Sequence, residues 1–122
     1  MKVIIAGSRH MPFGMFHLID EAVKESNFQV TEVVCGLARG ADMFGGKWAV
    51  NNSIPVKTFP ANWDEHGKAA GPIRNQQMAE YADALIVFIW DGSRGSKDML
   101  MRMERMKKPT FAVWNGRIEE AF

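Results

Sequence analysis

Short apolar runs alternate with amphipathic stretches from one end of the chain to the other. The apolar runs are too short for buried helices, and they predict strands over residues 2–6, 31–35, 55–59, 84–90 and 110–114. The run at 84–90 is apolar at nearly every position, which is expected of a central strand covered on both faces.

Between these runs, apolar residues recur at helical spacing. The clearest pattern predicts an amphipathic helix over 15–25, with an apolar face formed by Phe16, Ile19, Ala22 and Val23. Weaker patterns predict helices over 42–52, 73–81 and 96–107. Gly45 and Gly46 weaken the first of these three. We expect an irregular segment over 60–72 and a short tail over 116–122.

This alternation predicts an α/β fold. The expected architecture is a Rossmann-like three-layer sandwich, in which helices cover both faces of a five-stranded parallel sheet. A length of 122 residues fits one core, so we expect residues 1–122 to form a single domain. Ligands of such sheets bind at the carboxyl ends of the strands, beside the point where the strand order reverses.

The composition is ordinary for a globular domain, with 47% hydrophobic and 24% charged residues. The formal net charge of +1 gives no general electrostatic argument for binding nucleic acid or an acidic membrane. No apolar run approaches the roughly 20 residues that span a bilayer, and none resembles a secretory signal, so we expect a cytoplasmic protein with no membrane partner. The single cysteine, Cys35, excludes an internal disulfide and is expected to be a buried hydrophobe.

Three glycine-bearing turns each follow an apolar run and precede a predicted helix. They are Gly7-Ser8-Arg9, the segment 36–42 and the segment 91–96. Such a turn directs backbone N–H groups and the positive end of a helix dipole toward an anion. Each turn also contains an arginine, which binds phosphate through a fork of donors. The turns predict a site for a phosphate-bearing small molecule such as a nucleotide.

The second turn brackets Arg39 between Gly36 and Gly40 and ends at Asp42. Its glycines allow the backbone to approach a ligand closely. Asp42 either caps the following helix or binds a ribose hydroxyl, and the sequence leaves both readings open. Because no G-K-[ST] motif is present, ATP hydrolysis of the P-loop kind has no support.

The third turn follows the most apolar strand and is the strongest candidate for the phosphate cradle. We expect Ser96 to N-cap the next helix and Gly95 to turn its N–H toward a phosphate. Further upstream, Pro72 opens another predicted helix, which places Arg74 and Asn75 near the positive end of its dipole. An arginine at that end of a helix is favourable only beside an anion, so Arg74 is a predicted ligand contact.

Several residues keep two interpretations. Lys68, in a glycine-bearing segment, is either a lid cation or a solvated lysine. Trp63 and Trp90 either stack on a base or pack against the protein. The methionines of 99–106 form either a soft core face or a contact in a homo-oligomer.

Groups suited to catalysis or metal binding are scattered. His10, His17 and His66 form no Ser/His/Asp pattern and no metal-ligand spacing, so we expect no metal and no cofactor. Asp42 and Asp98 are the candidate catalytic carboxylates if the protein is an enzyme. No pair of carboxylates has a spacing that indicates acid–base catalysis.

Four segments, taken together and in order, resemble the SLOG superfamily of Rossmann-like nucleotide-binding proteins, in particular its small YspA- and YpsA-related branch. They are 3–9, 35–42, 70–75 followed by Met78, and 90–96 followed by Met99. The superfamily includes the LOG-type phosphoribohydrolases and the DNA-processing protein DprA. The resemblance implies a nucleotide-derived ligand at the carboxyl edge of the sheet, contacted by Gly7, Ser8, Arg9, Gly36, Arg39, Gly40, Asp42, Arg74, Asn75, Gly92, Ser93, Gly95 and Ser96.

The chain departs from the LOG enzymes at one position. Their G-G-x-G-T-x-x-E signature ends in a catalytic glutamate, and Met99 stands at that place here. A thioether does no acid–base work. Asp98 is one residue away, and one residue turns a helical side chain by about 100°, so it is a poor substitute.

We therefore expect a binding module that senses or sequesters a nucleotide-derived molecule, such as an ADP-ribose-like or cyclic nucleotide signal. The resemblance implies a phage or bacterial setting, with a role in signalling or defence. One alternative is a nucleotide hydrolase of the LOG type. A second is single-stranded DNA binding as in DprA, against which the net charge of +1 argues.

Overall fold

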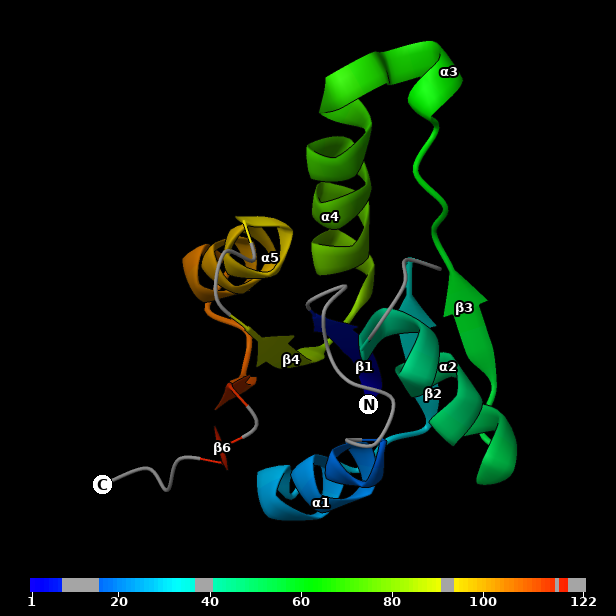
Figure 1. Cartoon of the computed structure of the whole chain (residues 1–122), viewed down its shortest axis with the longest axis vertical. Coiled ribbons are helices and arrows are strands. Elements are labelled where there is room, and N and C mark those ends of the chain that lie inside the picture. The colour runs from blue at the N-terminus through cyan, green and yellow to red at the C-terminus, as the bar shows by residue number, and fades with distance from the viewer. Residues whose placement is uncertain (8–15, 37–40, 91–93, 116, 119–122) are drawn as a thin grey trace.

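The structure is a computed structural model that describes residues 1–7, 16–36, 41–90, 94–115 and 117–118. Within these residues the chain forms one six-stranded sheet with the order β3-β2-β1-β4-β5-β6 (Figure 1). The strands are β1 (Lys2–Gly7), β2 (Glu32–Cys35), β3 (Val56–Thr58), β4 (Ala84–Ile89), β5 (Thr110–Trp114) and β6 (Arg117–Ile118).

The first five strands pair in parallel, which confirms the predicted five-stranded parallel sheet. β6 pairs with β5 in the antiparallel sense, with Val113 opposite Ile118. The expectation of a plain tail over 116–122 was therefore wrong at 117–118. Two residues carry too weak a pattern to be recognised as a strand without knowledge of the neighbouring edge.

The helices of the described residues are α1 (His17–Ser26), α2 (Ala41–Asn51), α3 (Trp63–His66), α4 (Ala70–Tyr81) and α5 (Arg94–Arg105), with the short 3-10 helix η2 (Gly67–Ala69) between α3 and α4. The predicted helices are present, with boundaries shifted by one to three residues. The segment 60–72, predicted to be irregular, is instead largely helical.

Successive residues of β1 face opposite sides of the sheet, as the two-residue repeat of a strand requires. Ile5 packs with α1 and α2 in one core cluster, in which Ile19 and Trp48 are buried. Ile4 packs with α4 and α5 in the other cluster, in which Met78 and Met103 are buried. All residues of β4 are buried, as the apolar run predicts. The result is the expected three-layer sandwich.

The two glycines of α2 have different roles. A Cβ at Gly45 would lie 2.5 Å from Cγ2 of Ile5, so the helix approaches β1 more closely than any side chain would allow. A Cβ at Gly46 would lie 3.8 Å from Sγ of Cys35, which is ordinary contact. Close packing of α2 against the sheet therefore requires glycine at position 45, although this glycine weakens the helical pattern of the sequence.

The strand order reverses beside β1. From β1 the chain steps outward to β2 and β3, and then crosses to β4 on the other side of β1. The carboxyl ends of β1 and β4 are therefore adjacent, with Gly7 in register with Phe88. In an open parallel sheet this is the place where a crevice for a ligand forms.

The carboxyl end of α4 is held near the amino-terminal ends of the strands. Nζ of Lys108 donates to the carbonyls of Ala79 and Ala82 over 2.7 and 2.8 Å, where a cation favourably meets the negative end of a helix dipole. The hydroxyl of Tyr81 donates to the carboxylate of Glu32, at the start of β2. These contacts fix the orientation of α4, and with it the direction in which its other end projects.

Two helix caps that the sequence suggested, one of them as one of two interpretations, are not at the cap position. Ala41 precedes Asp42 in α2, so Asp42 is the second residue of that helix rather than its N-cap. Ser96 is the third residue of α5 and also lies inside its helix. In both cases the helix extends further toward the glycine turn than the polar residue suggested, since helix ends are the least certain part of a sequence pattern.

Candidate functional site

Arg74 reaches from α4 to the carboxyl end of β2. Its Nη1 donates to the carbonyl of Gly36 over 3.1 Å, and its Nε donates to Oδ1 of Asn75 over 3.1 Å. A Cβ on Gly36 would lie 2.2 Å from that same Nη1. The glycine therefore leaves the space that the guanidinium occupies, although its own φ is not in the left-handed region.

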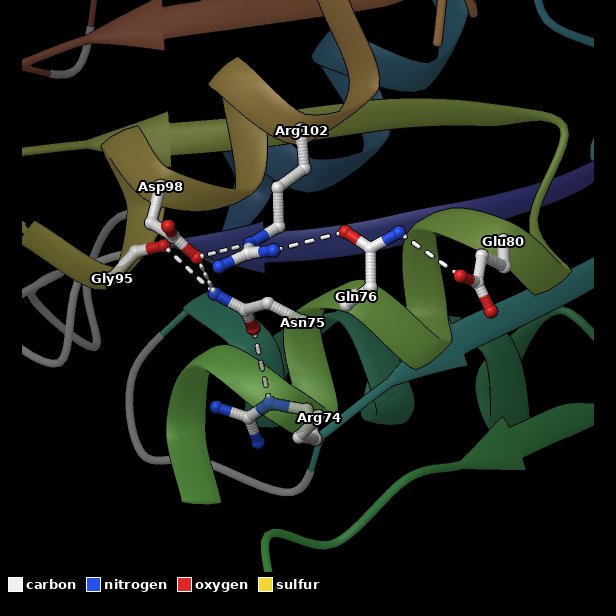
Figure 2. Close-up of polar contacts among 7 residues, drawn as sticks. All are labelled: Arg74, Asn75, Gln76, Glu80, Gly95, Asp98 and Arg102. Atoms are coloured by element: carbon white, nitrogen blue, oxygen red, sulfur yellow. Dashed lines mark hydrogen bonds and ion pairs between the residues drawn. The ribbon is translucent and has the colours of Figure 1, made fainter. Parts of the chain in front are cut away.

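Asn75 faces the neighbouring helix and is only 7% exposed. Its Nδ2 donates to the carbonyl of Gly95 over 3.2 Å and to Oδ2 of Asp98 over 3.0 Å (Figure 2). A buried amide requires such partners, because burial of an unpaired polar group is costly. Arg74 and Asn75, adjacent in sequence, thus join the end of β2 to the first turn of α5.

A chain of polar contacts continues from Asp98 along the α4–α5 boundary. Nε of Arg102 donates to the same Oδ2 of Asp98 over 2.8 Å, and its Nη1 donates to Oε1 of Gln76 over 2.9 Å. Gln76 in turn donates to Glu80 (Figure 2). Asp98 was a candidate catalytic residue, and its carboxylate here holds an amide and a guanidinium. This is the geometry of a group that positions its neighbours.

The first turn of α5 contributes a second buried polar group. Ser96 is 7% exposed, and its side-chain hydroxyl makes no hydrogen bond to any residue in the described part of the chain. Met99, which stands where the LOG enzymes carry glutamate, is buried in the core beside Ile89 and Met103. The thioether is therefore a packing group.

Of the remaining predicted contacts, the structure describes some and not others. Gly7 ends β1 at the strand reversal, and Lys68 lies exposed in η2, just before α4. For Asp42 only its place in the first turn of α2 is described. The other predicted contacts lie outside the described residues: Ser8, Arg9, Arg39, Gly40, Gly92 and Ser93.

Sequence reasoning missed the start of α3. Oδ1 of Asn62 accepts from the backbone N–H of Glu65 over 3.1 Å, and the Glu65 carboxylate accepts from Nδ2 of Asn62 over 3.0 Å. The spacing Asn62-x-x-Glu65 is a capping signal that was present in the sequence.

The contacts between α4 and α5, Asn75 with Asp98 and Gln76 with Arg102, carried no such signal, because only the pairing of the two helices brings these side chains together. The spacing of Asp98 and Arg102, four residues apart within α5, was present in the sequence.

A cavity of about 560 Å³ lies on the other side of the sheet, between α2 and the edge strand β3. Its lining is mainly apolar and includes Met43, Val50 and Val56, together with Lys47. This lining does not suit a phosphate. The polar groups suited to an anion lie instead with α4 and α5.

Neither a metal centre nor a membrane span is found among the described residues. Their His, Cys, Asp and Glu side chains do not gather in groups of three or more that could hold a metal ion. None of the helices in the same ranges has the length and apolar character needed to cross a bilayer.

The sequence pattern of the YspA, cpYpsA-related SLOG family matches residues 1–66, which include β1, β2 and the glycine-bearing segments after them. The chain belongs to this family. Its members' sequence pattern covers slightly more than half of the chain, and the α4–α5 pair lies beyond the match.

Two individual proteins are similar to the chain. The Gene 61 protein of Mycobacterium phage D29 is 31% identical over 83 residues, which are 63% of this chain and 66% of that protein. The X-ray structure of DNA processing protein A (DprA) from Streptococcus pneumoniae superimposes with a TM-score of 0.74 at 19% identity, over 91% of this chain. The chain spans about half of DprA, 49% of its length, and the likeness shows the fold.

Proposed function

We propose that the protein binds a nucleotide-derived small molecule, with its phosphate held between Arg74, Asn75 and the first turn of α5. The observation that carries this proposal is the placement of Arg74. A guanidinium is fixed at the carboxyl end of the parallel sheet by a backbone carbonyl and a buried amide. Such a preorganised fork suits an anionic oxygen, because little side-chain freedom remains to be lost on binding.

The first turn of α5 supports the same site. The N–H groups of a first helical turn have no partners within the helix, and the dipole adds partial positive charge there. The buried hydroxyl of Ser96 adds a donor close to these groups. Family membership supports a nucleotide as the source of the phosphate.

Binding without turnover is the favoured form of this function. The carboxylate of Asp98 is engaged by Asn75 and Arg102, and Met99 lies in the core. Asp42 remains the candidate carboxylate if the ligand is hydrolysed. The protein thus acts as a sensor or sequestering module for this molecule.

The test is mass spectrometry of the small molecule that co-purifies with the protein, followed by calorimetry with ADP-ribose and cyclic AMP. We expect a phosphate-bearing molecule that fresh protein leaves unchanged. Arg74→Ala should lower its affinity roughly 10-fold or more, since a charged hydrogen-bond donor is lost. Arg105→Ala, which removes an exposed arginine at the far end of α5, is the matched control.

Three results would contradict the proposal. Conversion of the molecule during incubation would establish an enzyme. Equal affinity in the Arg74→Ala variant and the wild type would exclude the site. Absence of any bound or binding nucleotide would exclude the ligand class.

A further inference from the structure

We propose that the indole of Trp63 is the stacking platform for the flat ring of the bound nucleotide. This inference rests on the proposed function and adds the second half of its site, the part that would recognise a base. It starts from an exposed aromatic side chain at the free end of α4.

Trp63 is the most exposed of the four tryptophans. This residue is 53% exposed, whereas Trp48 is buried and Trp90 and Trp114 are half-buried. An aromatic ring open to water offers a flat face on which a base can stack. About half of the Trp63 surface is therefore available to a ligand.

The other half of the ring is fixed in place. A Cβ on Gly71 would lie 3.5 Å from Cη2 of Trp63, so the indole rests on α4 at Gly71. The hydrogen bonds between Asn62 and Glu65 hold the start of α3, from which Trp63 projects. The ring is thus held against a long helix rather than on a free loop, which lowers the entropic cost of stacking on it.

The position of Trp63 relative to the phosphate site follows from the helix. Gly71 and Arg74 are three residues apart and lie on neighbouring parts of one helical face, about 4.5 Å apart along the axis. Trp63 at Gly71 is therefore about one turn further from the sheet than Arg74. Figure 1 shows α3 at the end of α4 that projects beyond the carboxyl ends of the strands. A nucleotide with its phosphate at Arg74 could place its base on the indole, with the sugar between them.

The experiment compares a probe with a base and a probe without one. ADP-ribose and ribose 5-phosphate are titrated into wild-type protein and into Trp63→Leu, Trp63→Phe and Arg74→Ala variants. We expect Trp63→Leu to weaken ADP-ribose binding about 10-fold, which is typical of a lost base–aromatic stack, and to leave ribose 5-phosphate binding unchanged. Trp63→Phe, which keeps an aromatic face, should retain most of the affinity. Arg74→Ala should weaken both probes.

Fluorescence gives a second measurement on the unmodified protein. Acrylamide quenches the exposed Trp63 more readily than the other tryptophans, so ADP-ribose should protect the emission and ribose 5-phosphate should not. Circular dichroism and the melting temperature establish that each variant is folded.

The possible results separate this inference from the proposed function. If Arg74→Ala loses ADP-ribose while Trp63→Leu binds it as tightly as the wild type, the stacking role is wrong and the phosphate site stands. An equal loss of both probes in Trp63→Leu also overturns stacking, since it indicates that Trp63 only holds α3 in place. If the wild type binds neither probe, the proposed function fails and this inference fails with it.

Discussion

Nη1 of Arg74 donates a hydrogen bond to the backbone carbonyl of Gly36, 38 residues earlier in the chain and 3.1 Å away. The contact joins a helix on one face of the sheet to the carboxyl end of β2. It is possible because Gly36 has no side chain, since a Cβ there would lie 2.2 Å from the same nitrogen. The arginine of one motif and the glycine of another thus form a single unit.

Replacement of Gly36 by alanine should displace Arg74 without unfolding the protein. The clash involves the end of a flexible side chain, and the backbone of Gly36 does not require a positive φ. We expect Gly36→Ala to lower affinity for the co-purifying ligand by about the same factor as Arg74→Ala. Calorimetry on both variants and on the double variant measures the coupling between the two positions.

If Gly36 acts through Arg74, the double variant should bind no worse than Arg74→Ala alone. Additive losses would instead show that Gly36 contacts the ligand independently. A large fall in melting temperature for Gly36→Ala would contradict the assumption that Arg74 can move aside.

The ion pair between Asp98 and Arg102 should contribute more to stability than the other helical pair of the same spacing. Both pairs have N–O distances of 2.8 Å, but the Asp98 and Arg102 side chains are 25% and 23% exposed, whereas those of Asp20 and Lys24 are 47% and 74% exposed. Urea unfolding should give a loss of about 1–2 kcal/mol for Arg102→Met and a distinctly smaller loss for Lys24→Met, because water screens an exposed ion pair.

The same variant also tests the function of the network. Without Arg102, Asp98 loses a charged partner, so the carboxylate that accepts from Asn75 is held less firmly. Affinity for the ligand should fall several-fold. Equal losses of stability in Arg102→Met and Lys24→Met would show that the network is an ordinary surface feature.

The sequence predicted the order of the parallel strands and the longer helices well, because these strands coincide with short runs rich in apolar residues and glycine-bearing turns follow β1, β2 and β4. It predicted Arg74 and Asn75 as ligand contacts from their place near a helix start. The structure brings Arg74 to the carboxyl end of β2, but α4 begins at Ala70, so both residues lie beyond its first turn, and ligand contact stays a prediction.

The sequence did not predict Arg102, although Arg102 stands four residues after Asp98 within α5, a spacing that the sequence shows. It did not predict Gln76 either, since Gln76 meets Arg102 only when α4 lies beside α5. Contacts between two helices leave no periodic pattern in the sequence of either helix.

Substitution of the two α2 glycines should give opposite results. Gly45→Ala places a Cβ 2.5 Å from Cγ2 and 2.7 Å from Cβ of Ile5, both in the buried center of β1. Overpacking of this kind costs about 1–3 kcal/mol. Gly46→Ala meets no such contact and should be neutral or stabilise the helix by up to about 1 kcal/mol. Chemical denaturation of the two variants checks the difference, and similar stabilities would refute the close packing of α2 on β1.

Tyr81 should titrate at higher pH than a free tyrosine. Its hydrogen bond to the carboxylate of Glu32 is the main cause that raises the pKa of the phenol above 10.0, with burial and the charge of Glu32 acting in the same direction. Tyr81 is the single tyrosine of the chain, so absorbance at 295 nm reports this group alone. Glu32→Gln should return the pKa toward its ordinary value.

The raised pKa has a defined effect on stability. The folded protein holds the phenolic proton more tightly than the unfolded chain. The contribution of the Tyr81–Glu32 hydrogen bond to the free energy of unfolding is therefore complete below the unfolded pKa near 10, and it is lost as the pH rises through the folded pKa. Tyr81→Phe should remove this part of the alkaline loss of stability. An unshifted titration in the wild type would contradict the contact.

The glycines of α2 and the capping residues show where sequence reasoning stops. Gly45 looked like a defect in a helix because its benefit lies in Ile5, 40 residues away. Asp42 and Ser96 looked like helix caps because such residues are common at helix starts, whereas the helices begin one and two residues earlier. Local preference identifies that a helix begins nearby, and tertiary packing decides at which residue.

The antiparallel β6 changes what the sheet offers to other chains. It occupies the outer hydrogen-bonding edge of β5 for part of its length, at Val113 and Trp114. At the opposite edge, β3 has three residues and follows Pro55, which lacks an N–H to donate. Both borders of an otherwise extensible parallel sheet are thus poor templates for a further strand, a feature that disfavours edge-to-edge joining of two sheets.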